Sequence, residues 1–559
     1  MPVSNITNTV DFMKYFLFII LICLCQGIPF STKDFVKRYP CLEYNVCECS
    51  EGIYDPPYSD TVTVDCRARN LTKIPALVDL DKNKYYRLWL RDNYIQLINS
   101  RDFSCDSIVD IDIGGYNQIR YVAAKALKVT NRFLQKLTLN ISSLNIYKLR
   151  FLHAVPTLYE LTIEGNNKLH KISSRLLPGY KMKTLRMLSL MHCGIEKIAW
   201  DAFLGVSNVK ELHLSHNHLT NVPSDSLMGL HHLTKLDLSF NRLTTLDGQS
   251  FTQLFKLSEI DLTGNDFTEM QEIPSDVFKD QEASLHKLIL SNTFISTIPT
   301  EAIQNLQELK TLNISYNKIN ELNNNTQPFL GLKLQVLDIS GNNIPLEATL
   351  LNGLENTLFK LFLRDMNITS LPYTLLKKLG YLYELDISGN IMPKLPDYFN
   401  KGLSVRHFIL RRMNIKKISS RAFTKPSEIA ELSIDVESNF ISSIDFIRNS
   451  PACTFHYLNL MANPINCDCI LYELIVDRTI RFSGTCSSIS QNLLNLSFTS
   501  NYLQRMLQQK CSPRTFNSHC RNEYKSRLAP QTSGTSLHTY SNIFLLIGIN
   551  VANQLTLLQ

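Results

Sequence analysis

The sequence has no block of like charge. Its 57 lysines and arginines are interspersed with 50 aspartates and glutamates, which leaves a formal net charge of only +7 over 559 residues. Nucleic-acid-binding proteins usually concentrate positive charge on one face or in one tail. Nucleic acid is therefore not expected as a partner. The 44% of hydrophobic residues also excludes wholesale disorder, so most of the chain should fold.

The sequence also lacks the motifs of common enzyme classes. It contains no nucleophile elbow, P-loop, dinucleotide fingerprint, HExxH motif or EF-hand loop. Ser, His and Asp residues are numerous, but no pattern fixes three of them in triad geometry. We therefore expect no enzyme activity, no catalytic residue, no metal site and no cofactor.

Long apolar runs are scarce, and one of them lies near the N-terminus. The run Tyr15–Cys25, followed by small residues, is typical of a secretory signal peptide over residues 1–27, with the mature chain starting near Ile28. An uncleaved anchor is the alternative, although the run is shorter than the ~20 residues needed to cross a bilayer. Translation from Met13 would give a more ordinary signal peptide than translation from Met1.

A second apolar run ends the sequence. A polar stalk at 521–542 precedes the apolar tail at 543–559, and small residues around Ser533 have the layout of a glycosylphosphatidylinositol signal with Ser533 as attachment site. A membrane-spanning tail and plain secretion remain alternatives. In each case we expect the protein outside the cell or on its surface, and an anchored form would contact the membrane through this tail or its lipid.

Most cysteines outside the signal peptide lie in two clusters. Because secretion places them in an oxidising compartment, we expect disulfides; zinc is the alternative, but neither Cys-x-Cys pair has a partner pair at ligand spacing. The clusters consist of Cys41, Cys47, Cys49 and Cys66 near the N-terminus, and Cys467, Cys469, Cys486 and Cys511 near the C-terminus.

One repeated pattern, LxxLxLxxNxL, dominates the sequence. Successive starts are mostly 24 residues apart, and weaker matches near Tyr85, Ile108, Leu134 and Leu158 bring the array to about 16 repeats over residues 85–463. The clear starts are Leu185, Val209, Leu233, Leu257, Leu285, Leu309, Leu334, Leu358, Leu382, Val405, Ile429 and Phe455.

The pattern has a direct structural meaning. The LxL part alternates with period two, which predicts a short strand with two inward side chains and an outward one between them. A buried Asn after the strand can bind backbone groups where the chain turns. These asparagines are Asn93, Asn166, Asn217, Asn241, Asn265, Asn317, Asn342, Asn390 and Asn463. Cys193, Thr293, Met366 and Met413 replace the Asn, and we expect local irregularity there.

The repeats resemble those of the extracellular leucine-rich-repeat superfamily. The resemblance implies an α/β solenoid: a horseshoe with a parallel concave β-sheet and an irregular or short-helical convex side. The cysteine clusters resemble its caps, placed at 41–75 and 464–520. The caps imply the pairs Cys41–Cys49, Cys47–Cys66, Cys467–Cys486 and Cys469–Cys511, and Cys453 and Cys520, which flank the second cap, are a further candidate pair. The Trp common in the C-terminal cap is absent.

Cys193 is expected as a buried thiol outside any disulfide. It stands at the Asn position inside the core. Cys105 lies four repeats away, which at the spacing of neighbouring strands is about 20 Å, well past the ~7 Å limit for a disulfide.

Outward strand residues should align into a continuous binding surface. His192 and His216 occupy the same position in adjacent repeats, with His213 nearby, and are candidates for a pH sensor or a metal site; ordinary solvated histidines are the alternative. A basic patch is a candidate ligand-binding feature, with an ordinary solvated charged face as the alternative. Trp89, flanked by Arg87 and Arg91, is a second candidate, with packing over the N-terminal cap as the alternative. The patch consists of Lys360, Arg364, Arg406, Arg411, Arg412, Lys416 and Lys417, interrupted by Glu384 and Asp386.

Asn-x-Ser/Thr sites predict glycans, most of them occupied. A glycan on Asn313 or Asn140, both expected to point out of the sheet, would obstruct a partner locally. This elimination, together with charge, places the main contact on Arg364, Arg406, Arg411 and Arg412. The sites are Asn70, Asn140, Asn313, Asn324, Asn367 and Asn495.

These features predict an extracellular binding protein with a protein or glycan ligand. Similarity to adhesion and guidance proteins such as connectin, chaoptin and Slit implies adhesion between cells or a co-receptor role. Similarity to Toll ectodomains and variable lymphocyte receptors implies innate immune recognition as an alternative, although no intracellular signalling domain follows. A secreted matrix component is the third possibility.

Overall fold

A computed structural model gives the fold of the chain. It describes residues 37–42, 46–51, 61–77, 80–81, 83–141, 151–165, 169–174, 182–322, 327–424, 432–448, 455–477, 480–488 and 496–511. The chain divides into two compact units, each treated separately below. Unit 1 contains Met1–Ile391 with Leu403–Val405, and unit 2 contains Met392–Gly402 with Arg406–Gln559.

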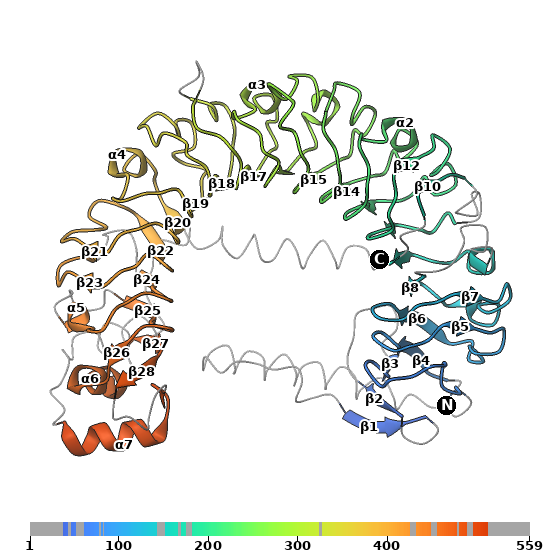
Figure 1. Cartoon of the computed structure of the whole chain (residues 1–559), viewed down its shortest axis with the longest axis horizontal. Coiled ribbons are helices and arrows are strands. Elements are labelled where there is room, and N and C mark those ends of the chain that lie inside the picture. Colours follow the sequence, from blue (N-terminus) through green and yellow to red (C-terminus); the bar gives the residue numbers. More distant parts are fainter. Residues whose placement is uncertain are drawn as a thin grey trace, which may run out of the picture. The chain divides into compact units, whose positions relative to one another are not determined.

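Unit 1 is a stack of short strands (Figure 1). Its first three strands pair antiparallel, and from β3 onward each strand pairs in parallel with the next. The strands are β1 (Lys37–Cys41), β2 (Cys47–Glu51), β3 (Thr61–Asp65), β4 (Tyr85–Trp89), β6 (Ile108–Ile113), β8 (Lys136–Asn140), β9 (Glu160–Glu164), β11 (Met187–Ser189), β13 (Glu211–His213), β14 (Lys235–Asp237), β15 (Glu259–Asp261), β16 (Lys287–Ile289), β17 (Thr311–Asn313), β18 (Val336–Asp338), β19 (Lys360–Phe362) and β20 (Leu382–Asp386).

The segments that return from one strand of unit 1 to the next contain only short elements. Buried phenylalanines such as Phe203, Phe251 and Phe329 fill the space behind the sheet. The elements are the strand pairs β5 (Leu97–Ile98) with β7 (Tyr121–Val122) and β10 (Lys171–Ile172) with β12 (Lys197–Ile198), the α-helices α2 (Ser224–Leu227), α3 (Thr300–Ile303) and α4 (Tyr373–Leu376), and the 3-10 helices η3 (Thr130–Arg132) and η6 (Lys279–Gln281).

Unit 2 continues the same design with fewer strands. Its sheet is parallel, and its helices are longer near the C-terminus. The elements are β22 (Val405–Ile409), β24 (Leu432–Asp435), β25 (Phe455–Asn459) and β27 (Arg481–Ser483) in the main sheet; β21 (Lys394–Leu395) with β23 (Lys417–Ile418); β26 (Ile465–Asn466), β28 (Thr485–Ser488) and β29 (Leu496–Ser497); and α5 (Asp445–Arg448), α6 (Cys469–Asp477) and α7 (Asn501–Lys510). The repeats thus form a parallel-strand solenoid of about 16 turns, as the sequence predicts.

The asparagines after the strands act as predicted. Asn241 is typical: its Nδ2 donates to the carbonyls of Leu214 and Leu238, and its Oδ1 accepts the backbone N–H of Leu219. One side chain therefore links its own turn to the preceding one. Asn166 lies outside the described residues.

Two asparagines of this kind were missed. Asn117 and Asn439 are buried and make the same contacts. The start at Ile429 was wrong by two residues, because Ile434 pairs with Phe408 and takes the first inward position of the strand. The repeat that starts at Ile108 contains one extra residue before its Asn.

The expected irregularity where Asn is replaced takes one form. The residue after the replaced Asn has a positive φ in each case: Gly194 (62°), Phe294 (61°), Asn367 (57°) and Asn414 (57°). The Asn of the following repeat then binds this turn more extensively: Asn390 Oδ1 accepts backbone N–H groups from both Met366 and Ile368. The neighbouring repeat therefore binds both backbone N–H groups that flank the left-handed residue.

Four disulfides join the residues that the superfamily's caps imply. The bonds are Cys41–Cys49, Cys47–Cys66, Cys467–Cys486 and Cys469–Cys511. Cys193 is fully buried, and its Sγ lies 3.3 Å from the carbonyl oxygen of Ile163. Cys453, Cys520, the signal peptide (1–27), the stalk and the tail lie outside the described residues.

Candidate functional site

The solvent side of the parallel strands, called the sheet face here, carries the candidate site. Near the start of unit 1 this face is hollowed next to Trp89, on β4. The hollow has a volume of about 340 Å³ and is called the Trp89 hollow. Its lining residues are Arg67, Trp89, Arg91, Asp110, Asp112, Lys136, Leu137, Thr138, Glu160 and Thr162.

Strand register explains why these residues meet. Trp89 pairs with Asp65 on one side and with Asp112 on the other, so one row of the sheet face places an aromatic ring between two carboxylates. A second row, two residues earlier in each strand, places Asp110 between Arg87 and Lys136. The sequence alone gave Trp89 and its flanking arginines, but not the acidic residues from β6.

The cations of the Trp89 hollow are held by carboxylates. Arg91 Nε lies 3.0 Å from Asp112 Oδ2, and Arg91 Nη2 lies 3.2 Å from Glu164 Oε1. Lys136 Nζ lies 2.8 Å from Glu160 Oε1. The hollow is therefore a preorganised polar surface, because these side chains are already oriented by their partners.

Arg67 fixes the indole ring of Trp89. Its guanidinium carbon lies 4.6 Å from the ring centroid, a cation–π contact, and its Nη2 lies 2.6 Å from Asp65 Oδ2. The guanidinium hydrogen bond, together with nearby positive charge, holds the pKa of Asp65 below its usual value even though burial raises it. Trp89 is half-buried, so the ring remains partly open to a partner.

Asp110 differs from the other carboxylates of the Trp89 hollow. Burial raises the pKa of Asp110 to about 6, although its hydrogen bond to Trp89 and the charges of Lys136 and Arg87 lower it. Among the described residues, Asp110 has no lysine or arginine partner at ion-pair distance. It is thus a poorly solvated carboxylate without a counter-ion of its own.

The histidine pair forms a ring stack. The ring centroids of His192 and His216 lie 4.2 Å apart, and His216 stacks on Phe240 at 4.5 Å. Burial, followed by the charge of His216, lowers the pKa of His192 below its usual value. His213 lies apart from the stack, with Nδ1 3.5 Å from Asp237 Oδ2. Within the described ranges, no group of three or more His, Cys, Asp or Glu side chains is placed to hold a metal ion.

The predicted basic patch is divided between the units. In unit 1, Arg364 Nη2 lies 2.6 Å from Asp338 Oδ2, and Arg364 Nε lies 3.9 Å from Asp386 Oδ2. Arg364 is therefore neutralised within its own sheet face and is a weaker candidate for binding an acidic ligand than the sequence suggested.

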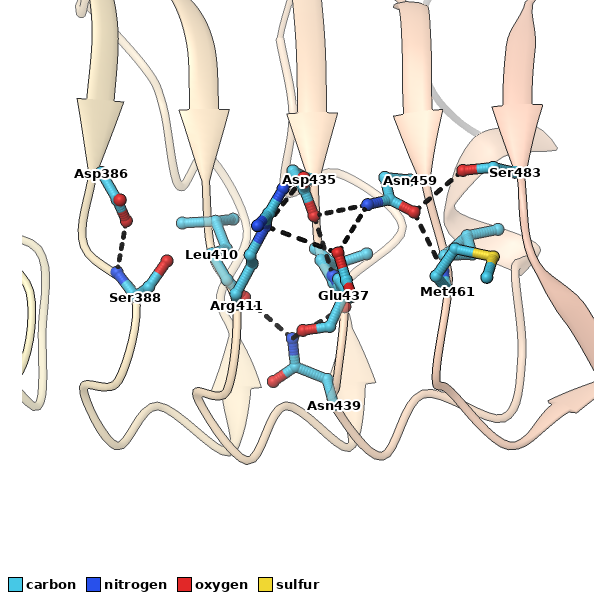
Figure 2. A network of polar contacts seen from close by, with 12 residues as sticks. Asp386, Ser388, Leu410, Arg411, Asp435, Glu437, Asn439, Asn459, Met461 and Ser483 are labelled. Atoms are coloured by element: carbon cyan, nitrogen blue, oxygen red, sulfur yellow. Dashed lines mark hydrogen bonds and ion pairs between the residues drawn. The ribbon is translucent and has the colours of Figure 1, made fainter. Parts of the chain in front are cut away.

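In unit 2, Arg411 belongs to the polar network of Figure 2. Arg411 donates to Asp435 Oδ2 from Nη2 at 2.6 Å, and Asp435 is only 4% exposed. Asn459 Nδ2 joins Asp435 to Glu437 at 3.0 and 3.1 Å. The Arg411 side chain is 47% exposed, but it is also the counter-ion of a buried carboxylate.

Arg406 and Arg412 are both exposed in unit 2. Arg412 occupies the turn after the strand with φ 52°. Arg411 and Arg412 therefore differ in role although they are adjacent in the sequence.

The glycosylation sites fall into two groups. Asn70 and Asn367 are exposed, whereas Asn313 and Asn140 are half-buried. The Nδ2 atom of Asn140, which would carry the glycan, donates to the Gly115 carbonyl at 2.5 Å. Occupancy stays a prediction for all of these sites; Asn324 and Asn495 lie outside the described residues.

Comparison with known proteins agrees with the repeat pattern. A family model described as leucine rich repeat matches residues 156–219, 183–243, 207–267 and 283–344. The chain therefore contains leucine-rich repeats and folds as a leucine-rich-repeat solenoid. Among the residues that the structure describes, no helix combines the length and apolar character needed to cross a membrane.

Several curated proteins are similar over short segments. Chaoptin of Drosophila melanogaster is 36% identical over 141 residues, which cover 24% of this chain and 10% of chaoptin. Tsukushi-A of Xenopus laevis is 30% identical over 136 residues, covering 24% of this chain and 39% of that protein. Osteomodulin of Rattus norvegicus is 31% identical, covering 24% and 31%. The chain thus matches well under two thirds of each relative.

Solved structures with a similar fold include the Leptospira interrogans leucine-rich-repeat protein LIC12759. It has a TM-score of 0.47 and 20% identity, covering 75% of this chain and 94% of that one. A TLR13–ssRNA13 complex has a TM-score of 0.40 and 17% identity, covering 75% and 71%.

Proposed function

We propose that this protein is an extracellular recognition protein that binds a protein partner through the sheet face of unit 1, centred on the Trp89 hollow. One observation carries the proposal: a half-buried Trp is held in place by Arg67 beside ordered charged side chains on an open surface. Preorganised Trp and Arg residues are the commonest binding hot spots. Disulfides and extracellular relatives support a location outside the cell.

The biological role that fits best is adhesion between cells or action as a co-receptor. This role rests on the superfamily resemblance and on the proposed anchor at Ser533. If the anchor exists, phosphatidylinositol-specific phospholipase C releases the protein from cells, and peptides from 543–559 are missing from the surface form. Recovery of those terminal peptides from the surface protein would refute the anchor.

Trp89→Ala tests the binding proposal, and Trp200→Ala is its matched control. Trp200 is the only other tryptophan and is 67% exposed, away from the Trp89 hollow. The chain is displayed on cells, proximal surface proteins are captured by cross-linking, and the affinity of the captured partner is then measured. We expect Trp89→Ala to weaken binding at least tenfold, about 1.4 kcal/mol, and Trp200→Ala to leave it unchanged.

A third variant tests the other predicted contact. Arg412→Glu reverses an exposed charge in unit 2 without touching the Asp435 network. If Arg412→Glu weakens capture while Trp89→Ala does not, the contact lies on the basic residues of unit 2 and the Trp89 hollow is not the binding site.

A further inference from the structure

We propose that the Trp89 hollow recognises a cationic side chain of the partner, a guanidinium or an ammonium group, with Asp110 as its counter-ion. The inference rests on the proposed function and names the chemical group that this site takes. An acidic or glycan sulfate group is the competing ligand, since the hollow also contains three cations.

The cations of the hollow are poor acceptors of a new anion. Arg67 is paired with Asp65 at 2.6 Å, Arg91 with Asp112 at 3.0 Å and with Glu164 at 3.2 Å, and Lys136 with Glu160 at 2.8 Å. An incoming carboxylate or sulfate would have to displace these side chains from oriented partners, and that loss offsets most of the gain.

The carboxylates outnumber the cations. When the charged neighbours outside the lining are included, four basic side chains, Arg67, Arg87, Arg91 and Lys136, face five acidic ones. The acidic residues are Asp65, Asp110, Asp112, Glu160 and Glu164. The local charge is therefore negative, which attracts a cation and repels an anion.

Asp110 is the carboxylate left to receive the cation. It lies in register between Arg87 and Lys136, yet Lys136 Nζ is taken by Glu160. Trp89, fixed by Arg67, stands next to it. A guanidinium or ammonium inserted here would gain a charge-assisted hydrogen bond in a poorly hydrated place, where such bonds are strongest.

The titration of Asp110 supports this assignment and adds a pH dependence. Burial raises the pKa of Asp110 to about 6, with Asp112 raising it further and Trp89, Lys136 and Arg87 opposing. A bound cation favours the ionised form, so binding is strongest above pH 6 and weakens as Asp110 becomes protonated below it. From pH 7.4 to pH 5 the expected loss is about tenfold.

Trp89 itself provides the readout. The full secreted chain carrying Trp200→Phe has a single tryptophan, so its fluorescence reports on the hollow. The probes are the pentapeptides acetyl-Gly-Gly-Arg-Gly-Gly-amide, the same peptide with citrulline in place of Arg, and the same peptide with Glu. Citrulline keeps the shape and loses the charge.

We expect a saturable fluorescence change with the Arg peptide at pH 7.4, at least tenfold weaker with citrulline and about tenfold weaker at pH 5. Asp110→Asn should abolish both the charge preference and the pH dependence, whereas Asp261→Asn, a matched change on the sheet face at β15, should alter neither. Circular dichroism confirms that each variant is folded.

Other results overturn the inference. Equal binding of the Arg and citrulline peptides would show that the site does not recognise charge. Preferential binding of the Glu peptide would show that the cations of the hollow bind the ligand. Normal binding of the Arg peptide by Asp110→Asn would show that Asp110 is not the counter-ion. If Trp89→Ala abolishes partner capture while no cation preference is found, the proposed function stands and this inference fails. Cation binding without any captured partner supports the site and refutes the proposed function.

Discussion

At the scale of single residues, Asp110 combines a cost in stability with a place in the candidate site. Its pKa is about 6 in the folded protein against 3.8 for an ordinary Asp, so folding disfavours its ionised form. The penalty is fully present above pH 6, shrinks as the pH falls through 6, and is gone below about 4. A residue kept at such a cost is typical of sites where function and stability compete.

Asp110→Asn is therefore expected to stabilise unit 1 at neutral pH. Because the side chain is partly exposed to the Trp89 hollow, we expect a gain on the order of 1–2 kcal/mol in the free energy of unfolding at pH 7.4, and no gain at pH 4. Urea unfolding at the two pH values measures it. A variant that is less stable at pH 7.4 would show that the Asp110 carboxylate contributes to folding.

Arg411 and Arg412 provide a second comparison of neighbouring residues. Arg411→Glu would place a carboxylate against Asp435, which is buried, and Glu437, so we expect a loss of about 2 kcal/mol in the stability of unit 2. Arg412→Glu should change stability by less than about 0.5 kcal/mol, since the exposed Arg412 side chain makes no ion pair within the described residues. Thermal unfolding of the two variants measures the difference, and equal midpoints would contradict it.

The different roles of Arg411 and Arg412 were not predicted from the sequence. The partner of Arg411 comes from the next repeat, and that repeat was misaligned by two residues at Ile429. A start at Ile429 matches the first three apolar positions but places Glu437 at the Asn position, whereas a start at Glu431 places Asn439 there. The pairing of Ile434 with Phe408 shows that the second register is the correct one. A pairwise contact across strands depends on register, which the spacing within one repeat does not fix.

At the scale of the repeat, the Asn turn was predicted in kind but not in all its positions. Starts from Leu185 to Val405 were correct because each has its LxL strand and most have the Asn. The replaced positions gave the expected irregularity, and the left-handed residue that follows each of them is its physical form. Asn117 was missed because one extra residue precedes it.

The asparagine that compensates for a missing neighbour should be worth more than an ordinary one. Asn390 Oδ1 accepts two backbone N–H groups, from Met366 and Ile368, whereas Asn241 Oδ1 accepts one from Leu219. Both make the same pair of bonds through Nδ2 to the carbonyls at the strand ends, and Asn241 Nδ2 adds only a long contact of 3.3 Å to the Ser239 carbonyl.

We expect Asn390→Ala to destabilise unit 1 more than Asn241→Ala by about 1–2 kcal/mol, the cost of one further buried N–H left unpaired. Urea unfolding compares the variants, and hydrogen exchange locates the opening. Faster exchange at Met366 in Asn390→Ala, without an equivalent effect at Asn217 in Asn241→Ala, is the specific signature. Equal losses of stability would mean that the extra bond has no net value.

At the scale of the whole molecule, the solenoid and its disulfide-bonded ends follow from the sequence, whereas the candidate site does not. The repeat pattern dictates stacking because no single repeat buries its own apolar face. The Trp89 hollow arises from side chains of consecutive turns, on β4, β6, β8 and β9, and its charge balance depends on which carboxylate each cation reaches. Such a surface is specified by neighbouring turns together, so no single repeat reveals it.

Nearest-neighbour stacking also predicts how the molecule loses structure. Strands in the middle of unit 1, such as β13–β15, pair with a strand on each side. The first repeats of unit 1 contain β1–β3, which two disulfides cross-link, and the last part of unit 2 contains α6–α7, where the other two disulfides lie. Reduction should therefore speed hydrogen exchange first at both ends while β13–β15 stay protected, because end turns have one stacking partner and their cross-links limit the unfolded state. Hydrogen–deuterium exchange mass spectrometry with and without a phosphine reductant measures this.

The repeat that contains Cys193 is an internal control, since it has no disulfide among the described residues. Early exchange in this repeat would show that the reductant acts other than through the end disulfides. Uniform exchange would show that the array opens as one cooperative body.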